Sequence, residues 1–281
     1  METSEVPGVA LITGAGSGIG RATAVTFVKR GCKQLALLDL NENGLATSKR
    51  VVEEVVGSAT KRSTLIIRTY KCDVSSEESV ATAYATAKQD FGRIDYSVHC
   101  AGIVSVGKTS PEMSVEEFDK QSNINFRGLW LSSREALRHM SSQTLDSEAY
   151  PEEGILSTRG QRGSIVNISS SLALYTQPNT TVYTAVKAAV LGITRSDAVD
   201  YANDRIRVNA VLPGIIESPM TTATPELKEW MQGNPVQHTP YKRFGLPEEI
   251  ADVIVFLSGN RASLVTGASW TADGGLTAGY N

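Results

Sequence analysis

The sequence predicts a doubly wound α/β fold, in which one parallel sheet carries helices on both faces. Short apolar runs rich in Val, Ile and Leu alternate with longer segments of helical periodicity along the whole chain. Most of these runs are apolar at odd and even positions alike, as in strands that are covered on both sides. No linker-like stretch, low-complexity stretch or internal repeat interrupts the alternation. We therefore expect residues 1–281 to form a single domain with a sheet of about seven strands.

Seven runs are expected to form the strands, with helices in the gaps between them. In chain order they are VALIT (9–13), QLALLD (34–39), TLIIRTY (64–70), IDYSVHC (94–100), SIVNIS (164–169), IRVNAV (206–211) and ASWTA (268–272). Ligands of an open parallel sheet bind at the carboxyl ends of its strands. The functional residues are therefore sought in the segments that follow strands.

Residues 141–162, SSQTLDSEAYPEEGILSTRGQR, break the alternation. The segment is polar, mixed in charge and poor in periodicity, which is typical of a long surface loop. It leads into the beginning of an expected strand. We therefore expect it on the edge of the sheet away from the ligand site.

Composition excludes several kinds of partner. The chain has 27 basic and 30 acidic residues, and a net charge of −3 gives no electrostatic reason to bind nucleic acid or an anionic membrane. We see no secretory signal in the opening METSEVPGVALITG, and no stretch approaches the roughly 20 apolar residues of a membrane span. Cys32, Cys72 and Cys100 are widely spaced and show no metal-ligand spacing. We expect a cytoplasmic protein without a metal centre.

The glycine-rich stretch TGAGSGIG follows the first expected strand and opens a helix. Glycine permits a tight turn and lets the backbone approach a pyrophosphate, whose charge is favoured at the positive end of a helix. The spacing is not G-x-G-x-x-G, but its position between a strand and a helix predicts a Rossmann-type dinucleotide site. The residues expected to touch the cofactor here are Gly14, Gly16, Ser17, Gly18, Ile19 and Gly20.

Asp39 ends the second expected strand, 19 residues after Gly20. An acidic residue at about this distance can accept hydrogen bonds from an adenosine ribose. A 2′-phosphate would be repelled there, and neither Ser17 nor Leu40 offers a positive charge to offset the repulsion. This favours NAD(H) over NADP(H). The alternative is that Asp39 caps the helix that begins with NENGL.

Two pairs place a tyrosine four residues before a lysine, a spacing that stacks the side chains on one helix face. In YATAK (84–88), Tyr84 shares an apolar stripe with neighbouring helix positions, so we expect its ring at the edge of the core and Lys88 in water. The pair in YTAVK (183–187) follows a strand that ends in three serines, where an α/β sheet presents its ligands. We expect the second pair to be reactive.

At this point the sequence resembles the short-chain dehydrogenase/reductase family, in its main rather than its extended branch. The resemblance covers nearly the whole chain. Its motifs are TGAGSGIG (13–20), CDV (72–74), NINFRG (123–128), GSIVNISS (163–170), YTAVK (183–187), VLPGIIESPM (211–220) and RFGLPEEIADVIVFL through DGG (243–275).

The resemblance implies a catalytic tetrad of Asn125, Ser170, Tyr183 and Lys187. Tyr183 would exchange a proton with the substrate oxygen during hydride transfer, and Ser170 would orient that oxygen. Lys187 would lower the pKa of the tyrosine and hold the nicotinamide ribose, while Asn125 would anchor a water linked to Lys187. A phenol of ordinary pKa near 10 needs such help at neutral pH. The less favoured candidates are Asn123, Ser169 and Ser171.

The same resemblance implies further cofactor contacts. Asp73 would reach the adenine, Ile216 and Ser218 would hold the carboxamide, and the other expected contacts are Val74, Ala101, Gly102, Pro213 and Gly214. One departure stands out, because the family's usual NNAG is HCAG at 99–102 in this chain. Cys100 is a weak substitute for a hydrogen-bonding amide, and His99 is expected to be packed rather than catalytic.

Residues 215–245 follow the carboxyl end of a strand and are expected to form a substrate lid. The lid is rich in apolar and aromatic side chains, including Tyr241 and Phe244, which favours a bulky hydrophobic alcohol or ketone. The expected substrate contacts are Ser170, Leu172, Tyr175, Tyr183, Met220 and Trp230. The resemblance extends to enzymes of secondary metabolism that act on terpenoid, steroid or polyketide-type compounds.

Small residues of the helix from Thr181 to Tyr201 permit close helix packing, and the family resemblance implies a homodimer or homotetramer. Two other functions stay open. The fold could serve a non-redox dehydratase, isomerase or cyclase, or an NAD-binding sensor without turnover.

Overall fold

The computed structural model describes residues 4–56, 64–233 and 235–279. Its centre is one parallel sheet of seven strands in the order β3-β2-β1-β4-β5-β6-β7. The strands are β1 (Val9–Thr13), β2 (Gln34–Asp39), β3 (Ile66–Lys71), β4 (Tyr96–His99), β5 (Gly163–Ile168), β6 (Ile206–Pro213) and β7 (Ser269–Ala272). The predicted doubly wound fold is confirmed.

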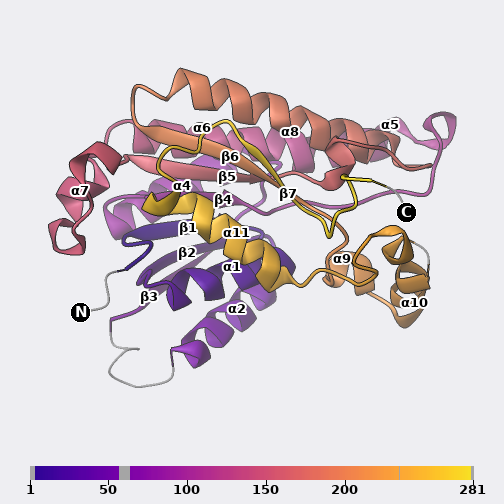
Figure 1. Cartoon of the computed structure of the whole chain (residues 1–281), viewed down its shortest axis with the longest axis horizontal. Coiled ribbons are helices and arrows are strands. Elements are labelled where there is room, and N and C mark those ends of the chain that lie inside the picture. The colour runs from indigo at the N-terminus through magenta and orange to yellow at the C-terminus, as the bar shows by residue number, and fades with distance from the viewer. Residues whose placement is uncertain (1–3, 57–63, 234, 280–281) are drawn as a thin grey trace.

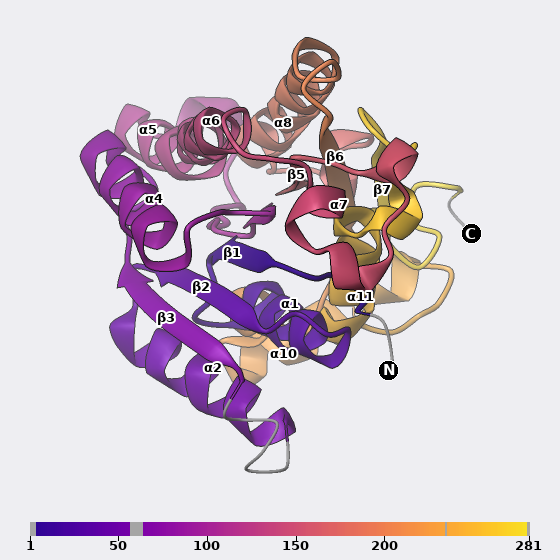
Figure 2. The same cartoon turned by 90° about the vertical axis from the view of Figure 1, so that its left-hand side faces the viewer.

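Helices cover both faces of the sheet (Figure 2). One face carries α1 (Gly18–Lys29), α2 (Glu42–Val55) and α11 (Pro247–Ser258). The other carries α4 (Glu77–Phe91), α5 (Val115–Ser122), α6 (Gly128–Met140) and α8 (Thr181–Asp200). The shorter helices are α7 (Asp146–Ala149), α9 (Pro219–Thr222) and α10 (Pro225–Gly233). None of the helices described is long and apolar enough to cross a membrane.

Local sequence explains the elements. All five residues of β1 and all six of β5 are buried, because helices cover both sides of the central strands. Helix α4 begins after Ser76, whose side chain accepts the Ser79 N–H, and ends at Gly92 in the left-handed region. Between the sheet and α1, Phe27 stacks on Tyr96 with 5.5 Å between ring centroids.

Predicted and observed strand bounds agree for β1 and β2 and differ by one or two residues at one or both ends of the other five strands. β1 and β2 match the expected residues, whereas β4 is shorter than 94–100 and β6 extends to Pro213. The first strand of the sheet order, β3, is exposed at four of its six residues, and Ile66 is 46% exposed. It lies at the sheet edge, so only part of its surface is covered and its apolar pattern is incomplete.

The 141–162 segment is more ordered than the loop that the sequence predicts. It contains α7 and two short 3₁₀ turns, and lies at the opposite end of the molecule from α9 and α10 (Figure 1). Buried polar side chains hold it: the Tyr150 hydroxyl donates to Asp95 (2.8 Å), and Gln143 donates to the carbonyl of Ile94 (2.8 Å). Such contacts with distant residues leave no periodic signal in the segment itself.

Candidate active site

The sheet order reverses direction between β1 and β4, which makes a crevice at their carboxyl ends. A pocket of about 320 Å³ lies there. It is lined by the glycine-rich loop, the ends of β2 and β4, and the start of α9. The expected cofactor residues that line it are Gly14, Ser17, Gly18, Ile19, Gly20, Asp39, Asp73, Val74, Ala101, Gly102 and Ser218.

The glycines of the loop are required by close backbone contacts. A Cβ on Gly20 would lie 2.1 Å from the carbonyl oxygen of Gly14, and Gly14 itself has a φ of +67°. The loop therefore turns tightly into α1 and leaves its N-terminus open to the pocket, as an anionic pyrophosphate requires. These residues fit a dinucleotide.

Asp39 lines this pocket and is also hydrogen-bonded to the glycine-rich loop. Its carboxylate accepts the N–H of Gly16 (2.8 Å) and the N–H of Asn41 (2.8 Å). The alternative role as a helix cap is wrong, because α2 is capped by Asn41, whose side chain accepts the Gly44 N–H at 3.1 Å. Arg21 is the nearby cation, and its guanidinium donates to Ser48 (2.9 Å) and to the carbonyl of Gly16.

The four residues of the expected tetrad come together from three parts of the chain. Tyr183 and Lys187 lie in the first two turns of α8, and the ammonium nitrogen is 5.7 Å from the centre of the tyrosine ring. Ser170 follows β5 and interacts with the Tyr183 phenol. A Cβ added to Gly102 would lie 2.8 Å from Asn125 Oδ1 and 3.7 Å from Lys187 Nζ. All four are at most 9% exposed.

Asn125 is fixed by an irregular turn. Residues Asn123–Arg127 form a π-helical turn between α5 and α6, with Asn125 as their buried member. Its side-chain amide donates to the carbonyl of Ile103 and accepts the N–H of Ile103, both at 2.9 Å. The alternative, Asn123, is exposed. This geometry favours Asn125, whose amide ties α5 and α6 to the segment after β4.

Lys187 and the three serines join the end of β5 to α8. The ammonium donates to the carbonyl of Ile168 (3.0 Å), and Ser169 donates to the carbonyl of Lys187 (2.7 Å). The Ser170 oxygen accepts a hydrogen bond from the N–H of Leu172 (3.2 Å), so its own O–H can donate a hydrogen bond to another group. Ser169 is therefore occupied with the backbone, whereas Ser170 faces the phenol.

The electrostatics differ from the sequence-based expectation. Burial raises the pKa of Tyr183 to about 12, although the Ser170 hydroxyl lowers it in part. Burial lowers the pKa of Lys187 to about 8. The Lys187 ammonium donates a hydrogen bond to a backbone carbonyl, and its positive charge alone does not offset the effect of burial on the pKa of the phenol. A further positive charge is needed beside the tyrosine, and an oxidised nicotinamide carries one.

The other tyrosine–lysine pair lies elsewhere. Tyr84 is fully buried in the core rather than at its edge, and Lys88 donates to the carbonyl of Gly92 (2.6 Å) at the end of α4. Burial raises the pKa of Tyr84 above its usual value. Its hydroxyl lies 2.9 Å from that of Ser97 and 3.2 Å from Nε2 of His99. The contacts of Tyr84 and Lys88 therefore indicate a structural role for this pair.

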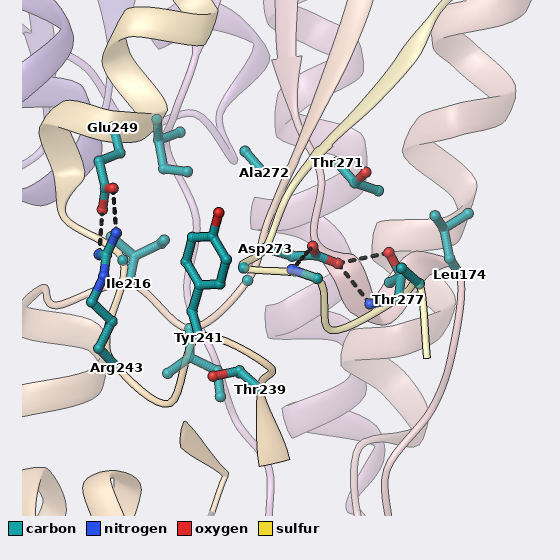
Figure 3. Close-up of a pocket in the computed structure, with 17 residues that line it drawn as sticks. Leu174, Ile216, Thr239, Tyr241, Arg243, Glu249, Thr271, Ala272, Asp273 and Thr277 are labelled. Atoms are coloured by element: carbon teal, nitrogen blue, oxygen red, sulfur yellow. Dashed lines mark hydrogen bonds and ion pairs between the residues drawn. The ribbon is translucent and has the colours of Figure 1, made fainter. Parts of the chain in front are cut away.

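A second pocket of about 750 Å³ lies between the end of the lid segment (residues 239–245), α11 and the turn after β7 (Figure 3). Tyr241 projects between two polar groups that are satisfied internally. Arg243 makes two hydrogen bonds to Glu249 (2.7 and 2.8 Å), and Asp273 accepts from the backbone and hydroxyl of Thr277 (2.9 and 2.6 Å). The apolar lining residues are Leu174, Ile215, Ile216, Ile250, Ala272 and Ala278.

Most of the substrate contacts expected from the sequence do not line either of the two pockets. Met220 is 40% exposed and lines the nucleotide pocket, and Trp230 is 57% exposed on α10. Five of the six expected substrate contacts line neither pocket: Ser170, Leu172, Tyr175, Tyr183 and Trp230. Leu174, on the turn after Ser170, lines the larger pocket. Sequence reasoning missed Leu174 and Ile250. No local signal marks them, because their pocket is formed by four segments that are distant from one another in sequence.

No cluster of three or more His, Cys, Asp or Glu side chains suited to a metal ion occurs within residues 4–56, 64–233 and 235–279.

A parallel sheet with a glycine-rich loop at its switch point defines a nucleotide-binding α/β protein of the Rossmann type. The family model described as enoyl-(acyl carrier protein) reductase matches residues 14–277. The chain belongs to the short-chain dehydrogenase/reductase family and is an oxidoreductase with a nicotinamide cofactor.

Individual relatives match over nearly their whole length. The chain is 37% identical over 278 residues to the short-chain dehydrogenase anuF of Penicillium roqueforti, with 97% of each chain covered. The crystal structure of levodione reductase is similar with a TM-score of 0.83 and 34% identity, covering 99% of this chain and 100% of that one. A 3-ketoacyl-(acyl-carrier-protein) reductase from Brucella melitensis, solved with NADH, has a TM-score of 0.79 and 28% identity, covering 96% and 98%.

Proposed function

We propose that the protein interconverts a secondary alcohol and a ketone on a bulky hydrophobic substrate, with NAD(H) as cofactor. The convergence of Ser170, Tyr183 and Lys187 beside the nucleotide pocket carries this proposal. The nicotinamide supplies or accepts the hydride. Tyr183 removes the hydroxyl proton during oxidation and returns it during reduction, while Ser170 orients the substrate oxygen.

Lys187 and Asn125 support these two groups. The Lys187 ammonium is held by the carbonyl of Ile168, close to the Gly102 backbone on the pocket wall. From there it would hold the nicotinamide ribose. Its position also adds positive charge near the phenol, and the charge of an oxidised nicotinamide would complete the lowering of the pKa of Tyr183. Asn125 would anchor a water beside Lys187.

The preference for a hydrophobic substrate rests on the pocket at the lid. Arg243 and Glu249 form an ion pair with each other, and the Asp273 carboxylate accepts hydrogen bonds from Thr277, so these groups leave little to bind a charged ligand. Leu174 connects this pocket with the turn that carries Ser170. A neutral, bulky alcohol fits a pocket of this composition. Terpenoid, steroid and polyketide-type alcohols are the proposed classes.

The experiment is to measure NADH formation by the purified protein with NAD⁺ and a panel of bulky secondary alcohols that includes steroids and terpenoids. Turnover with members of the panel, and little with charged or small alcohols, is the expected result. Tight NADH binding without turnover across the panel would favour an NAD-binding sensor. Product formation without net change of the cofactor would favour a non-redox enzyme.

Asp39 is proposed to select NAD(H). We expect Asp39→Asn to lower the ratio of kcat/KM for NAD⁺ to that for NADP⁺ by about 10-fold or more, because it removes a negative charge from the ribose side of the pocket. The amide oxygen can still accept one of the two backbone N–H groups. Steady-state kinetics with both cofactors test this. An unchanged ratio would mean that the carboxylate does not face the 2′-position.

A homodimer or homotetramer is proposed from the outer face of α8. Ala185 and Gly192 are exposed on this helix, and a Cβ on Gly192 would meet no atom within 4 Å. On the neighbouring helices α5 and α6, two large apolar side chains are exposed: Phe118 is 48% and Trp130 is 42% exposed. We expect Gly192→Arg to shift the protein to smaller species in analytical ultracentrifugation. An unchanged mass, with Gly192→Ala as control, would place the interface elsewhere.

A further inference from the structure

A buried chain of hydrogen-bonded polar side chains runs along one face of the sheet, beside the proposed active site. It runs from Tyr84 and Ser97 through His99 and Asn167 to Thr194, and each of the five is at most 2% exposed. It connects α4, β4, β5 and α8, the helix that carries Tyr183 and Lys187. The expectation that His99 is packed rather than catalytic does not explain why so many polar groups are placed here.

The donor and acceptor of each hydrogen bond in this series of side chains can be assigned. The Thr194 hydroxyl donates its one hydrogen bond to the carbonyl of Val190 (2.8 Å). It must therefore be the acceptor of the hydrogen bond from the side-chain NH₂ of Asn167 (3.0 Å). The oxygen of that amide then accepts from Nδ1 of His99 (2.7 Å). His99 therefore carries its proton on Nδ1, and Nε2 accepts from the Ser97 hydroxyl (2.9 Å). At this end of the series, the Tyr84 hydroxyl lies within hydrogen-bond distance of both Ser97 and His99.

Burial keeps the imidazole neutral. It lowers the pKa of His99 to about 4, so the ring has one donor and one acceptor at physiological pH, and the chain uses both. His99 and Asn167 are also directly paired residues in the register of β4 and β5. The neutral ring thus joins two strands through side chains in addition to their backbone ladder.

Both strands lead directly into the proposed site. After His99 come Cys100, Ala101 and Gly102, which line the nucleotide pocket. After Asn167 comes Ile168, whose carbonyl receives the Lys187 ammonium. Thr194 lies two helical turns beyond Lys187 on α8, so α8 is attached to β5 at two points along its length.

We propose that His99, through Asn167 and Thr194, is a positioning residue that sets Lys187 and the Cys100–Gly102 wall relative to each other. The inference rests on the proposed function. Lys187 lies on α8 and the Cys100–Gly102 wall follows β4, and these hydrogen bonds join β4 to α8 through β5. Buried networks of this kind fix one arrangement when every member is satisfied.

The test compares three changes. His99→Leu removes both hydrogen bonds of the ring, Thr194→Val removes the bond to Asn167 at nearly constant volume, and His99→Asn keeps an N–H donor for Asn167. The matched control is Ser133→Ala, which removes a partly buried hydrogen bond of 2.7 Å from α6 to Asp197 on the same helix α8. Thr194→Val keeps the proposal testable if His99→Leu does not fold.

We expect Thr194→Val and His99→Leu to lower kcat about 10-fold and to raise the NADH dissociation constant, with KM for the alcohol changed less than about twofold. His99→Asn should restore most of kcat, and Ser133→Ala should match the wild type. The proposal is overturned if Thr194→Val leaves kcat and NADH affinity unchanged, or if Ser133→Ala has the same effect.

Two readouts do not depend on turnover. Nitrogen NMR of histidine-labelled wild-type protein should show His99 protonated on Nδ1, and an Nε2–H signal would overturn the inference. NADH affinity is measured by fluorescence titration. If the wild type binds NADH but oxidises no alcohol, the proposed function fails, whereas the NADH affinities of Thr194→Val and Ser133→Ala still decide whether His99 has a positioning role.

Discussion

Tyr183→Phe is expected to lower kcat for alcohol oxidation by about 10³-fold while NADH binding changes little. The change removes only the phenolic oxygen, which is the proposed proton acceptor and donor, and general acid–base groups of this kind contribute about 10²–10⁴-fold. The ring, which lies 5.7 Å from the Lys187 ammonium, is kept. Steady-state kinetics and NADH titration of the same preparation separate the loss of chemistry from a loss of binding.

Tyr84→Phe is the matched control for this prediction. It removes the same atom from a tyrosine that also lies four residues before a lysine, but its hydroxyl belongs to the buried contact with Ser97 and His99. Ser97 can still donate to His99, so we expect kcat of the folded protein to be retained. The lost hydrogen bond should cost about 1–3 kcal/mol of stability. Equal losses of kcat from the two changes would contradict the assignment of Tyr183.

The second large effect is expected at the glycine-rich loop. Gly20→Ala would place a Cβ 2.1 Å from the Gly14 carbonyl oxygen and 2.7 Å from its carbon, both of which are backbone atoms that cannot rotate away. The loop must therefore shift out of the shape that approaches the pyrophosphate. We expect NADH affinity to fall by about 10-fold or more, with stability lowered by about 1–3 kcal/mol.

The control for this change is Gly233→Ala at the end of α10, where a Cβ would meet no atom within 4 Å. This variant should bind NADH as the wild type does and should keep its melting temperature, since alanine is favoured over glycine in helices. Fluorescence titration and thermal unfolding test both variants. If Gly20→Ala binds NADH normally, the nucleotide lies elsewhere in the protein.

Much of the fold and part of the site can be predicted from local sequence. β1 and β2 have the expected residues because their apolar side chains are buried on both sides. The glycine-rich loop was predicted for the same kind of reason, since the conformation of a tight turn depends on the residues within it. The tetrad was inferred from a resemblance, and the structure brings Asn125 close to Lys187 although 62 positions separate them.

The sequence by itself therefore determined the strands, the glycine-rich turn and the spacing of Tyr183 and Lys187, because these depend on neighbours within a few residues. Only the tertiary structure decided what surrounds each side chain. The π-helical turn at Asn125, the raised pKa of Tyr183 and the chain through His99 arise from segments that meet after folding. Burial and hydrogen-bond partners are set by these distant contacts, and they decide which polar groups are charged and which are held in place.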